Sequence, residues 1–262
     1  MTLSGQTALV TGASSGLGAA FARALARRGA ALVLVARSEG VLHQTAEQLR
    51  GAHGGRVEVI SQDLAQEGAA DAVAARLTEL GVTVDMLVNN AGFATQGPWE
   101  TIRPERDHAQ VMVNVVAVVD LTHALVPGML ERGAGSVVNV ASLGGFQPAP
   151  RLAVYAASKA FVLSLGQALA AELGGGGVRV LTVCPGPIDT PFFDVLGSRD
   201  AAIGQQVTPE QVVDRALRAL ERGRTLVVPG WRNALTAHAS RLLPRRLVLA
   251  VAERATRPLD TL

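Results

Sequence analysis

Residues 7–18 read T-A-L-V-T-G-A-S-S-G-L-G, and this stretch decides the fold. A short apolar run ends in a turn with glycines at positions 12, 16 and 18, and the helical pattern F-A-R-A-L-A-R-R-G follows at 21–29. A strand, a glycine-rich turn and a helix in this order are typical of the first unit of a parallel α/β sheet. The spacing is G-x3-G-x-G rather than the commoner G-x-G-x-x-G, so the rest of the chain has to support the assignment.

Strand-length apolar runs alternate with longer helical patterns along the whole chain. Strands are predicted at 7–10, 31–36, 57–61, 86–89, 136–140, 178–183 and 226–229. Helices are predicted near 16–29, 39–50, 66–80, 104–131, 152–173 and 209–222. Continuous apolar runs such as A-L-V-L-V-A predict strands buried on both faces, and strict alternation with helices predicts parallel pairing. We therefore expect a single α/β domain, a doubly wound, Rossmann-type sheet of seven parallel strands. The glycines at 174–177 are interpreted as the stop of the long helix.

The composition predicts a large buried core. Hydrophobic residues make up 48% and charged residues 18%, and the net charge of +2 is too small to indicate a polyanionic partner. The single cysteine, Cys184, excludes intramolecular disulfides and cysteine-cluster metal sites, and no metal site is predicted. The chain shows neither a signal-peptide pattern nor an uninterrupted apolar run of about 18 residues, so a cytoplasmic location is expected.

The C-terminal stretch 231–262 differs from the rest in charge. It holds six arginines against Glu253 and Asp260, and Pro244 is expected to divide two short helices. We interpret the stretch as a basic amphipathic extension that covers the core of the domain formed by residues 1–230. Contact with an anionic membrane surface, a substrate lid and a subunit contact remain open alternatives.

The glycine-rich turn predicts a dinucleotide site. Glycines permit close backbone approach to a pyrophosphate, and the new helix offers unpaired N–H groups to it. The predicted contacts are Gly12, Ser14, Ser15, Gly16, Leu17 and Gly18. At the end of the second strand, Ala36-Arg37-Ser38 lacks an acid that would bind the adenosine ribose, whereas Arg37 suits a phosphate. NADP(H) is therefore the predicted cofactor, with NAD(H) as the alternative.

Tyr155 is the only tyrosine and Lys159 the only lysine in this chain, although 23 arginines are present. Residues four apart on a helix share a face, and an ammonium has a tunable pKa that a guanidinium lacks. The attraction between a cation and a phenolate about 4 Å apart has an energy of about 4 kcal/mol at an effective dielectric of 20. We expect this attraction to lower the phenol pKa from its ordinary value near 10 toward neutrality. The pair is therefore predicted to transfer protons.

The chain resembles the short-chain dehydrogenase/reductase family. The matching pieces are T-G-A-S-S-G-L-G at 11–18, D-L at 63–64, N-N-A-G at 89–92, Asn114, Ser142, Y-x3-K at 155–159 and P-G-P-I-D-T at 185–190. The resemblance implies that Tyr155 protonates a carbonyl oxygen to which Ser142 hydrogen-bonds. Lys159 would hold the nicotinamide ribose, and Asn114 would anchor a water of the proton relay.

The same resemblance implies further cofactor contacts. Asp63 and Leu64 would meet adenine, and Asn90, Ala91 and Gly92 would meet the nucleotide near the centre of the sheet. Ile188 and Thr190 would meet the carboxamide of the nicotinamide. A loop cap for Asp63 and a turn former for Asn90 remain the structural alternatives.

The substrate is less well defined by the sequence. The stretches at 126–142 and 154–173 are similar to the branch that contains 3-ketoacyl-CoA and 17-beta-hydroxysteroid reductases. This implies an NADPH-dependent reductase of a hydrophobic ketone or aldehyde, with Phe192 and Phe193 as an apolar wall or as ordinary loop packing. An NAD-dependent alcohol dehydrogenase and a nucleotide-sensing regulator remain alternatives. Family members commonly form homodimers or homotetramers, and no nucleic-acid motif is present.

Overall fold

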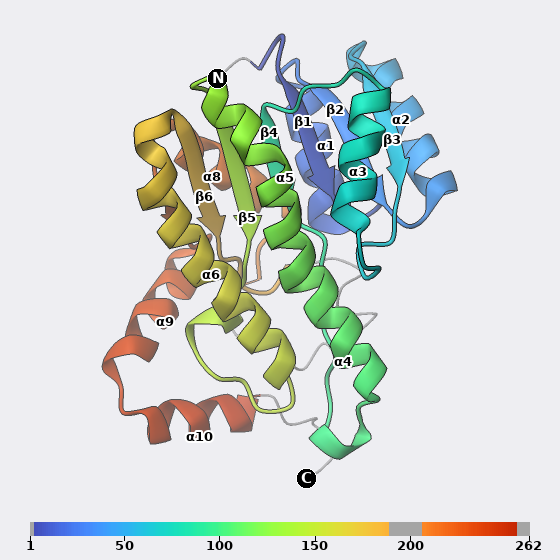
Figure 1. Ribbon diagram of the computed structural model, residues 1–262. Helices are drawn as coiled ribbons and strands as arrows, with labels where there is room; N and C mark the ends of the chain where they lie inside the picture. The colour runs from blue at the N-terminus through green and yellow to red at the C-terminus, as the bar shows by residue number, and fades with distance from the viewer. Residues whose placement is uncertain (1–2, 189–205, 256–262) are drawn as a thin grey trace.

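A parallel sheet forms the centre of the molecule (Figure 1). The computed structural model describes residues 3–188 and 206–255, apart from the side chains of 240–242 and 255. Neighbouring strands run parallel in the order β3-β2-β1-β4-β5-β6-β7. The strands are β1 (Thr7–Thr11), β2 (Ala31–Ala36), β3 (Val57–Ser61), β4 (Met86–Asn89), β5 (Gly135–Val140), β6 (Val178–Val183) and β7 (Leu226–Val227). The predicted seven-stranded doubly wound sheet is confirmed.

Helices cover both faces of the sheet (Figure 1). They are α1 (Gly16–Ala26), α2 (Glu39–His53), α3 (Ala69–Glu79), α4 (Pro104–Val111), α5 (Ala117–Glu131), α6 (Ala153–Leu173), α8 (Pro209–Glu221), α9 (Trp231–Leu242) and α10 (Arg245–Ala255). One layer contains α1, α2 and α8, and the opposite layer contains α3, α5 and α6. The strand order reverses direction between β1 and β4, and ligands of such sheets bind at the carboxyl ends of the strands beside that point.

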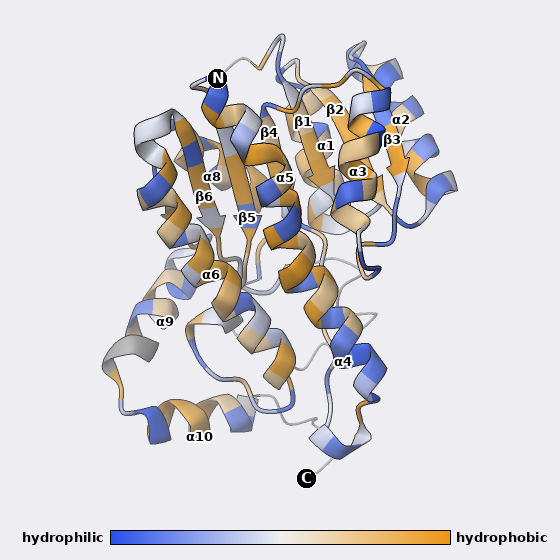
Figure 2. Cartoon of the chain, in the orientation of Figure 1, coloured by the Kyte–Doolittle hydropathy of each residue, from blue (hydrophilic) through white to orange (hydrophobic). Residues whose placement is uncertain are grey.

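Side-chain alternation along each strand divides the core into two layers. Ala8 and Val10 of β1 pack with Phe21 on the side of α1, whereas Leu9 packs with Leu121 on the side of α5. Both sets are apolar because helices cover both faces, which is the reason the strands read as continuous apolar runs. Figure 2 shows the strands in hydrophobic colours and α2 with a largely hydrophilic surface.

The helix predicted at 104–131 is not regular throughout. Residues Met112–Val116 form a π-helical turn between α4 and α5. Such turns insert one extra residue per turn and are frequent at functional sites. The buried Asn114 lies in this turn, and its amide bonds to the backbone of Phe93. The other helix predictions are confirmed to within a few residues, and Gly177 ends the turn after α6 at φ +79°.

The C-terminal extension forms two helices separated at Pro244, as predicted. In α9, Asn233 is buried and lies against Gly186, since a Cβ placed on Gly186 would come within 2.8 Å of Asn233 Cγ. In α10, Val248 is buried but Leu247 and Val251 are exposed. Helix α9 therefore packs on the α/β domain through Asn233, whereas α10 buries only the narrow face that carries Val248 and Ala252.

Two stretches, Pro104–Glu131 and Ala153–Gly176, are long and apolar enough by composition to cross a membrane. Both lie on the sheet: α5 contacts β4 and β5, and α6 contacts β5 and β6. Helices that pack on a central sheet have the same length and hydropathy, so this feature is explained by the fold.

A row of buried polar side chains crosses the sheet beneath α5 and α6. Asn89 and Asn139 are partners in the register of β4 and β5, and Asn139 is paired with Thr182 of β6. Asn89 Nδ2 donates to Asn139 Oδ1 at 2.9 Å and to Thr122 Oγ1 of α5 at 3.3 Å. On the same face of the sheet, α6 packs against β6 at Gly166, where a Cβ atom would collide with Thr182 Oγ1. A residue without a side chain is therefore required at this crossing.

We expect Gly166→Ala to lower the free energy of unfolding by about 1–3 kcal/mol, the usual cost of overpacking a core. Gly51→Ala is the matched control, because it lies inside α2 with no atom near its Cβ position and should be neutral or slightly stabilising. Chemical denaturation monitored by circular dichroism measures both. A Gly166→Ala protein as stable as the wild type would contradict the close approach of α6 to β6.

Candidate active site

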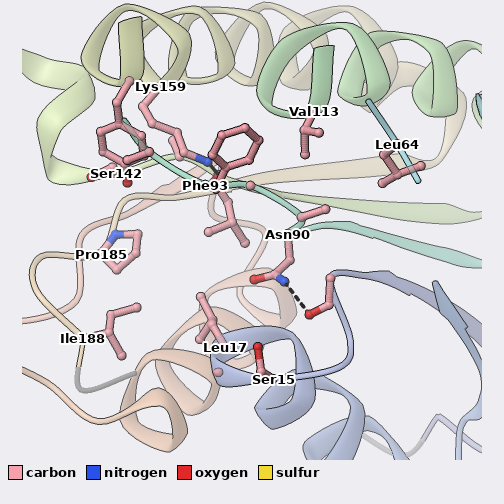
Figure 3. Close-up of a pocket in the computed structure, with 18 of the residues that line it drawn as sticks. Ser15, Leu17, Leu64, Asn90, Phe93, Val113, Ser142, Lys159, Pro185 and Ile188 are labelled. Atoms are coloured by element: carbon pink, nitrogen blue, oxygen red, sulfur yellow. Dashed lines mark hydrogen bonds between the residues drawn. The ribbon is translucent and has the colours of Figure 1, made fainter. Parts of the chain in front are cut away.

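A cavity of about 500 Å³ opens at the carboxyl ends of the strands. Figure 3 shows side chains of the glycine-rich turn on one side of it and side chains of α6 on the other. Most of the predicted site residues line it: Gly12, Ser14, Ser15, Gly16, Leu17, Arg37, Asp63, Leu64, Asn90, Ala91, Gly92, Ser142, Tyr155, Lys159 and Ile188. The fold therefore brings together residues that are scattered over most of the chain.

The glycine-rich turn lets the backbone follow the cavity wall. Gly12 has φ +65°, and a Cβ there would lie 2.9 Å from Ala91 Cα. Gly18 does not line the cavity, because it packs beneath the turn against the carbonyl of Gly12. Helix α1 begins at Gly16, and the Ser15 side chain makes no capping hydrogen bond. The first N–H groups of α1 lack intrahelical partners and carry the positive end of the helix dipole.

Thr11, which the sequence argument left without a role, fixes this turn to the next strand. Its buried Oγ1 accepts hydrogen bonds from the backbone N–H groups of Asn90 and Ala91, both at 2.9 Å. The Asn90 side chain returns the link, since its Nδ2 donates to Thr11 O at 2.8 Å. The position of Thr11 at the end of β1, directly before the first glycine, was the available signal.

The ends of β2 and β3 form one end of the cavity. Arg37 is exposed there, Ala36 precedes it, and no carboxylate stands at positions 36–38. Asp63 Oδ1 accepts a hydrogen bond from Ala65 N at 3.0 Å, so this residue caps its loop as well as lining the cavity. Leu64 is buried and contributes an apolar wall.

Ser142 and Tyr155 meet at the other end of the cavity. Ser142 follows β5, and its Oγ accepts a hydrogen bond from Gly144 N at 3.1 Å. A hydrogen bond from Ser142 lowers the pKa of Tyr155, but burial has the larger effect and raises that pKa above its ordinary value of 10.0. Cys184 raises it further. The phenol is therefore held in its protonated form.

Lys159 lies on the same face of α6 as Tyr155 and is 5% exposed. Its Nζ donates to Val140 O at 2.9 Å and lies 5.9 Å from the centre of the Tyr155 ring. Burial lowers the pKa of Lys159 to about 8, with Cys184 acting in the opposite direction. The expectation that the cation lowers the phenol pKa is wrong for the protein without cofactor, because burial disfavours the charged form of both groups.

Asn114 connects the π-helical turn to this pair. Its Oδ1 accepts from Phe93 N at 3.1 Å, and its Nδ2 donates to Phe93 O at 3.0 Å and to Ser158 Oγ at 3.1 Å. Ser158 Oγ in turn donates to Tyr155 O at 2.7 Å. A Cβ on Gly92 would lie 3.0 Å from Asn114 Oδ1 and 3.3 Å from Lys159 Nζ, so the two side chains meet above this glycine. Asn114 thus holds the backbone around the site, and its role in a proton relay stays a prediction.

Several lining residues were missed by the sequence argument. Phe93 and Arg106 come from the segment after β4, and Pro185 and Gly186 come from the segment after β6. Pro185 and Gly186 belong to the quoted P-G-P-I-D-T motif but were given no role, Phe93 directly follows the quoted N-N-A-G motif, and no sequence signal marked Arg106. Thr190, Phe192 and Phe193 lie outside the described residues. Among the side chains that the structure places, no group of three or more His, Cys, Asp or Glu residues is arranged to hold a metal ion.

Comparison with known proteins gives a consistent result. Residues 6–201 match the family described as short chain dehydrogenase. The ketoacyl reductase HetN of Nostoc sp. is 34% identical over 244 residues, which are 92% of this chain and 84% of that protein. A short-chain dehydrogenase from Sphingobium yanoikuyae, solved in complex with NADPH, superposes with a TM-score of 0.81 at 34% identity, covering 90% of this chain and 94% of that one. A 7beta-hydroxysteroid dehydrogenase superposes with a TM-score of 0.86 at 29% identity, covering 96% and 99%.

We expect Lys159 to titrate with a pKa of about 8 in the protein without cofactor, because burial disfavours its ammonium. Protein produced with isotope-labelled lysine gives one side-chain NMR signal, since the chain has a single lysine. Unfolded protein is the control, and there the midpoint should return to the ordinary value near 10.4. A midpoint in the folded protein at that ordinary value would contradict the burial.

Proposed function

The chain belongs to the short-chain dehydrogenase/reductase family of oxidoreductases, and from this premise we propose that it reduces a hydrophobic ketone or aldehyde to an alcohol with NADPH. The observation that carries the proposal is one cavity with two different ends. Arg37 stands at one end, and Ser142, Tyr155 and Lys159 stand at the other. An extended dinucleotide between them would present its nicotinamide to the tyrosine.

The residues present fit such a dinucleotide. The volume of about 500 Å³ lies within the range of cofactor sites. The start of α1 offers unpaired N–H groups for the pyrophosphate, and Leu64 with Ala91 offers apolar contact for the adenine. Arg37 would bind the 2′-phosphate, because a guanidinium pairs with phosphate oxygens through two N–H groups. NADPH in the complex of the Sphingobium relative supports the same preference.

Tyr155, Ser142 and Lys159 each have a separate task in the proposed reduction. NADPH held by these residues would supply the hydride that reduces the carbonyl carbon. Tyr155 gives its phenolic proton to the carbonyl oxygen as the new C–H bond forms, and Ser142 Oγ donates a hydrogen bond to that oxygen. Lys159, with a pKa of about 8, stabilises the phenolate that Tyr155 becomes and helps to return its proton.

The protonation of Tyr155 supports the direction of reduction. A general acid has to carry its proton before the reaction, and the Tyr155 phenol is protonated at neutral pH both at its ordinary pKa of 10.0 and with that pKa raised by burial. Alcohol oxidation needs the phenolate instead, so it should require a higher pH than reduction does.

The walls beside Tyr155 support a hydrophobic carbonyl substrate. Leu143, Ala149, Leu152 and Pro185 line this end of the cavity. The names of the relatives, a ketoacyl reductase and a hydroxysteroid dehydrogenase, point to acyl-chain or ring-system ketones. Screening steroidal, acyl-thioester and small ketones for NADPH oxidation identifies the class. A regulator that only senses nucleotides would bind NADPH and turn over none of them.

We also propose that the protein forms a homodimer or homotetramer. Val111, Leu130 and Phe161 are exposed apolar residues on α4, α5 and α6, where a second copy would cover them. We further propose that α10 can contact a membrane surface, because it carries arginines beside the exposed apolar residues Leu247 and Val251. The cytoplasmic location stays a prediction.

We expect Tyr155→Phe to lower kcat for ketone reduction by about a hundredfold or more, the usual contribution of a positioned acid. The affinity for NADPH, followed by its fluorescence, should stay nearly unchanged because the ring is retained. Substantial residual hydride transfer in this variant would refute the assignment of Tyr155 as the acid.

We expect Arg37→Ala to raise the KM for NADPH about tenfold or more while changing the KM for NADH little, because NADH lacks the phosphate that Arg37 would bind. Arg27→Ala is the control, since this exposed arginine does not line the cavity. Equal effects of Arg37→Ala on the two cofactors would show that Arg37 does not read the phosphate.

A further inference from the structure

Arg106 is a basic residue of the cavity that the reduction itself does not need. It lies in the first turns of α4 and lines the cavity, as Phe93 does. Its guanidinium carbon stands 5.0 Å from the centre of the Phe93 ring, within the range of a cation–π contact. Resting on the proposed reductase function, we propose that Arg106 binds an anionic group of the substrate, remote from the carbonyl that is reduced.

The position of Arg106 follows from the polar contacts around Phe93. The Asn114 amide bonds to both the N–H and the C=O of Phe93, at 3.1 and 3.0 Å, so this backbone is fixed from two sides. Phe93 directly follows Gly92, whose Cβ position lies 3.3 Å from Lys159 Nζ. The Phe93 ring therefore lies near the end of the cavity that holds Lys159, and the Arg106 guanidinium stacked on this ring could contact a ligand bound there.

Arg106 keeps its hydrogen-bonding capacity for such a ligand. A guanidinium has five N–H donors, and the Arg106 side chain makes no hydrogen bond or ion pair with the described residues; its backbone N–H donates to Arg103 O at 2.9 Å. The neighbouring Asp107 forms no ion pair with it; Asp107 Oδ1 accepts a hydrogen bond from Thr95 Oγ1 at 2.6 Å instead. The planar fork suits a carboxylate or phosphate, which it binds through two parallel N–H groups.

The surrounding charges favour an anion as well. Of the described residues that line the cavity, Asp63 carries the one carboxylate, and Ala65 N already donates to it. An anionic group near Phe93 therefore meets little repulsion. The substrate class that fits is a ketone with an apolar body and an acidic group, which is either its own carboxylate or a phosphate of an acyl carrier such as coenzyme A.

Two matched substrate pairs distinguish these sources. Para-acetylbenzoate and its methyl ester differ in the carboxylate, whereas acetoacetyl-4′-phosphopantetheine and acetoacetyl-pantetheine differ in the phosphate of the acyl carrier. We expect Arg106→Gln to lower the kcat/KM ratio of the anionic to the neutral member about tenfold in at least one pair, the effect of losing a charge-assisted hydrogen bond. High salt should reduce the wild-type ratio in the same pair.

Arg103→Gln is the matched control. Arg103 is also exposed and precedes α4, but it does not line the cavity, so this variant should keep the wild-type ratios. Unchanged ratios in Arg106→Gln for both pairs, or equal losses in the two variants, would overturn the proposal. A raised KM for NADPH in Arg106→Gln would also overturn it, because Arg106 would then contact the cofactor.

Failure of the reductase function gives a different result. In that case the wild type oxidises NADPH with neither the neutral nor the anionic ketones. Calorimetric titration of para-acetylbenzoate and its ester on the NADP-loaded protein then tests Arg106 alone. Weaker binding of the acid to Arg106→Gln than to Arg103→Gln supports the proposal, and equal binding refutes it.

Discussion

The close packing of α6 on the sheet determines where the reactive residues lie and how they are charged. Gly166 allows α6 to contact Thr182 of β6. Gly145 allows the segment after β5 to lie against the backbone of α6, because a Cβ atom on Gly145 would stand only 2.7 Å from Lys159 O. A helix this close to the sheet buries its inward face. That face carries Lys159, whose pKa falls to about 8, and the phenol of Tyr155, whose pKa rises. Burial thus disfavours the charged form of both groups: it keeps the Tyr155 phenol protonated, and it lets Lys159 lose its proton at a lower pH than an ordinary lysine does.

Polar contacts between segments complete the site. Thr11 ties the glycine-rich turn of β1 to the segment after β4, and Asn114 ties that segment to α6 through Ser158. Each contact joins two of the segments that line the cavity. The cavity wall is therefore held by buried and partly buried hydrogen bonds, which hold the backbone more rigidly than exposed contacts do. The exposed Arg37 and Arg106 are then free to act on ligands rather than on the fold.

Much of this could be predicted from the sequence. Apolar runs located all seven strands, because strands covered on both faces have no polar side. Helical spacing placed Tyr155 and Lys159 on one face. The sign of the change in the Tyr155 pKa could not be predicted, since the cost of burial depends on contacts with β5 and β6 that local spacing does not contain. The π-helical turn at Asn114 and the stacking of Arg106 on Phe93 likewise arise from contacts between distant segments.

The central claim is that burial, rather than the nearby cation, sets the protonation of Tyr155 before cofactor binds. Titration of the single tyrosine by NMR, with isotope-labelled tyrosine, tests this directly because one signal reports one group. In the folded protein without cofactor, the phenol should keep its proton beyond pH 10.0, its ordinary pKa. A midpoint below that value would show that burial is not the largest influence on the phenol, and it would contradict the account.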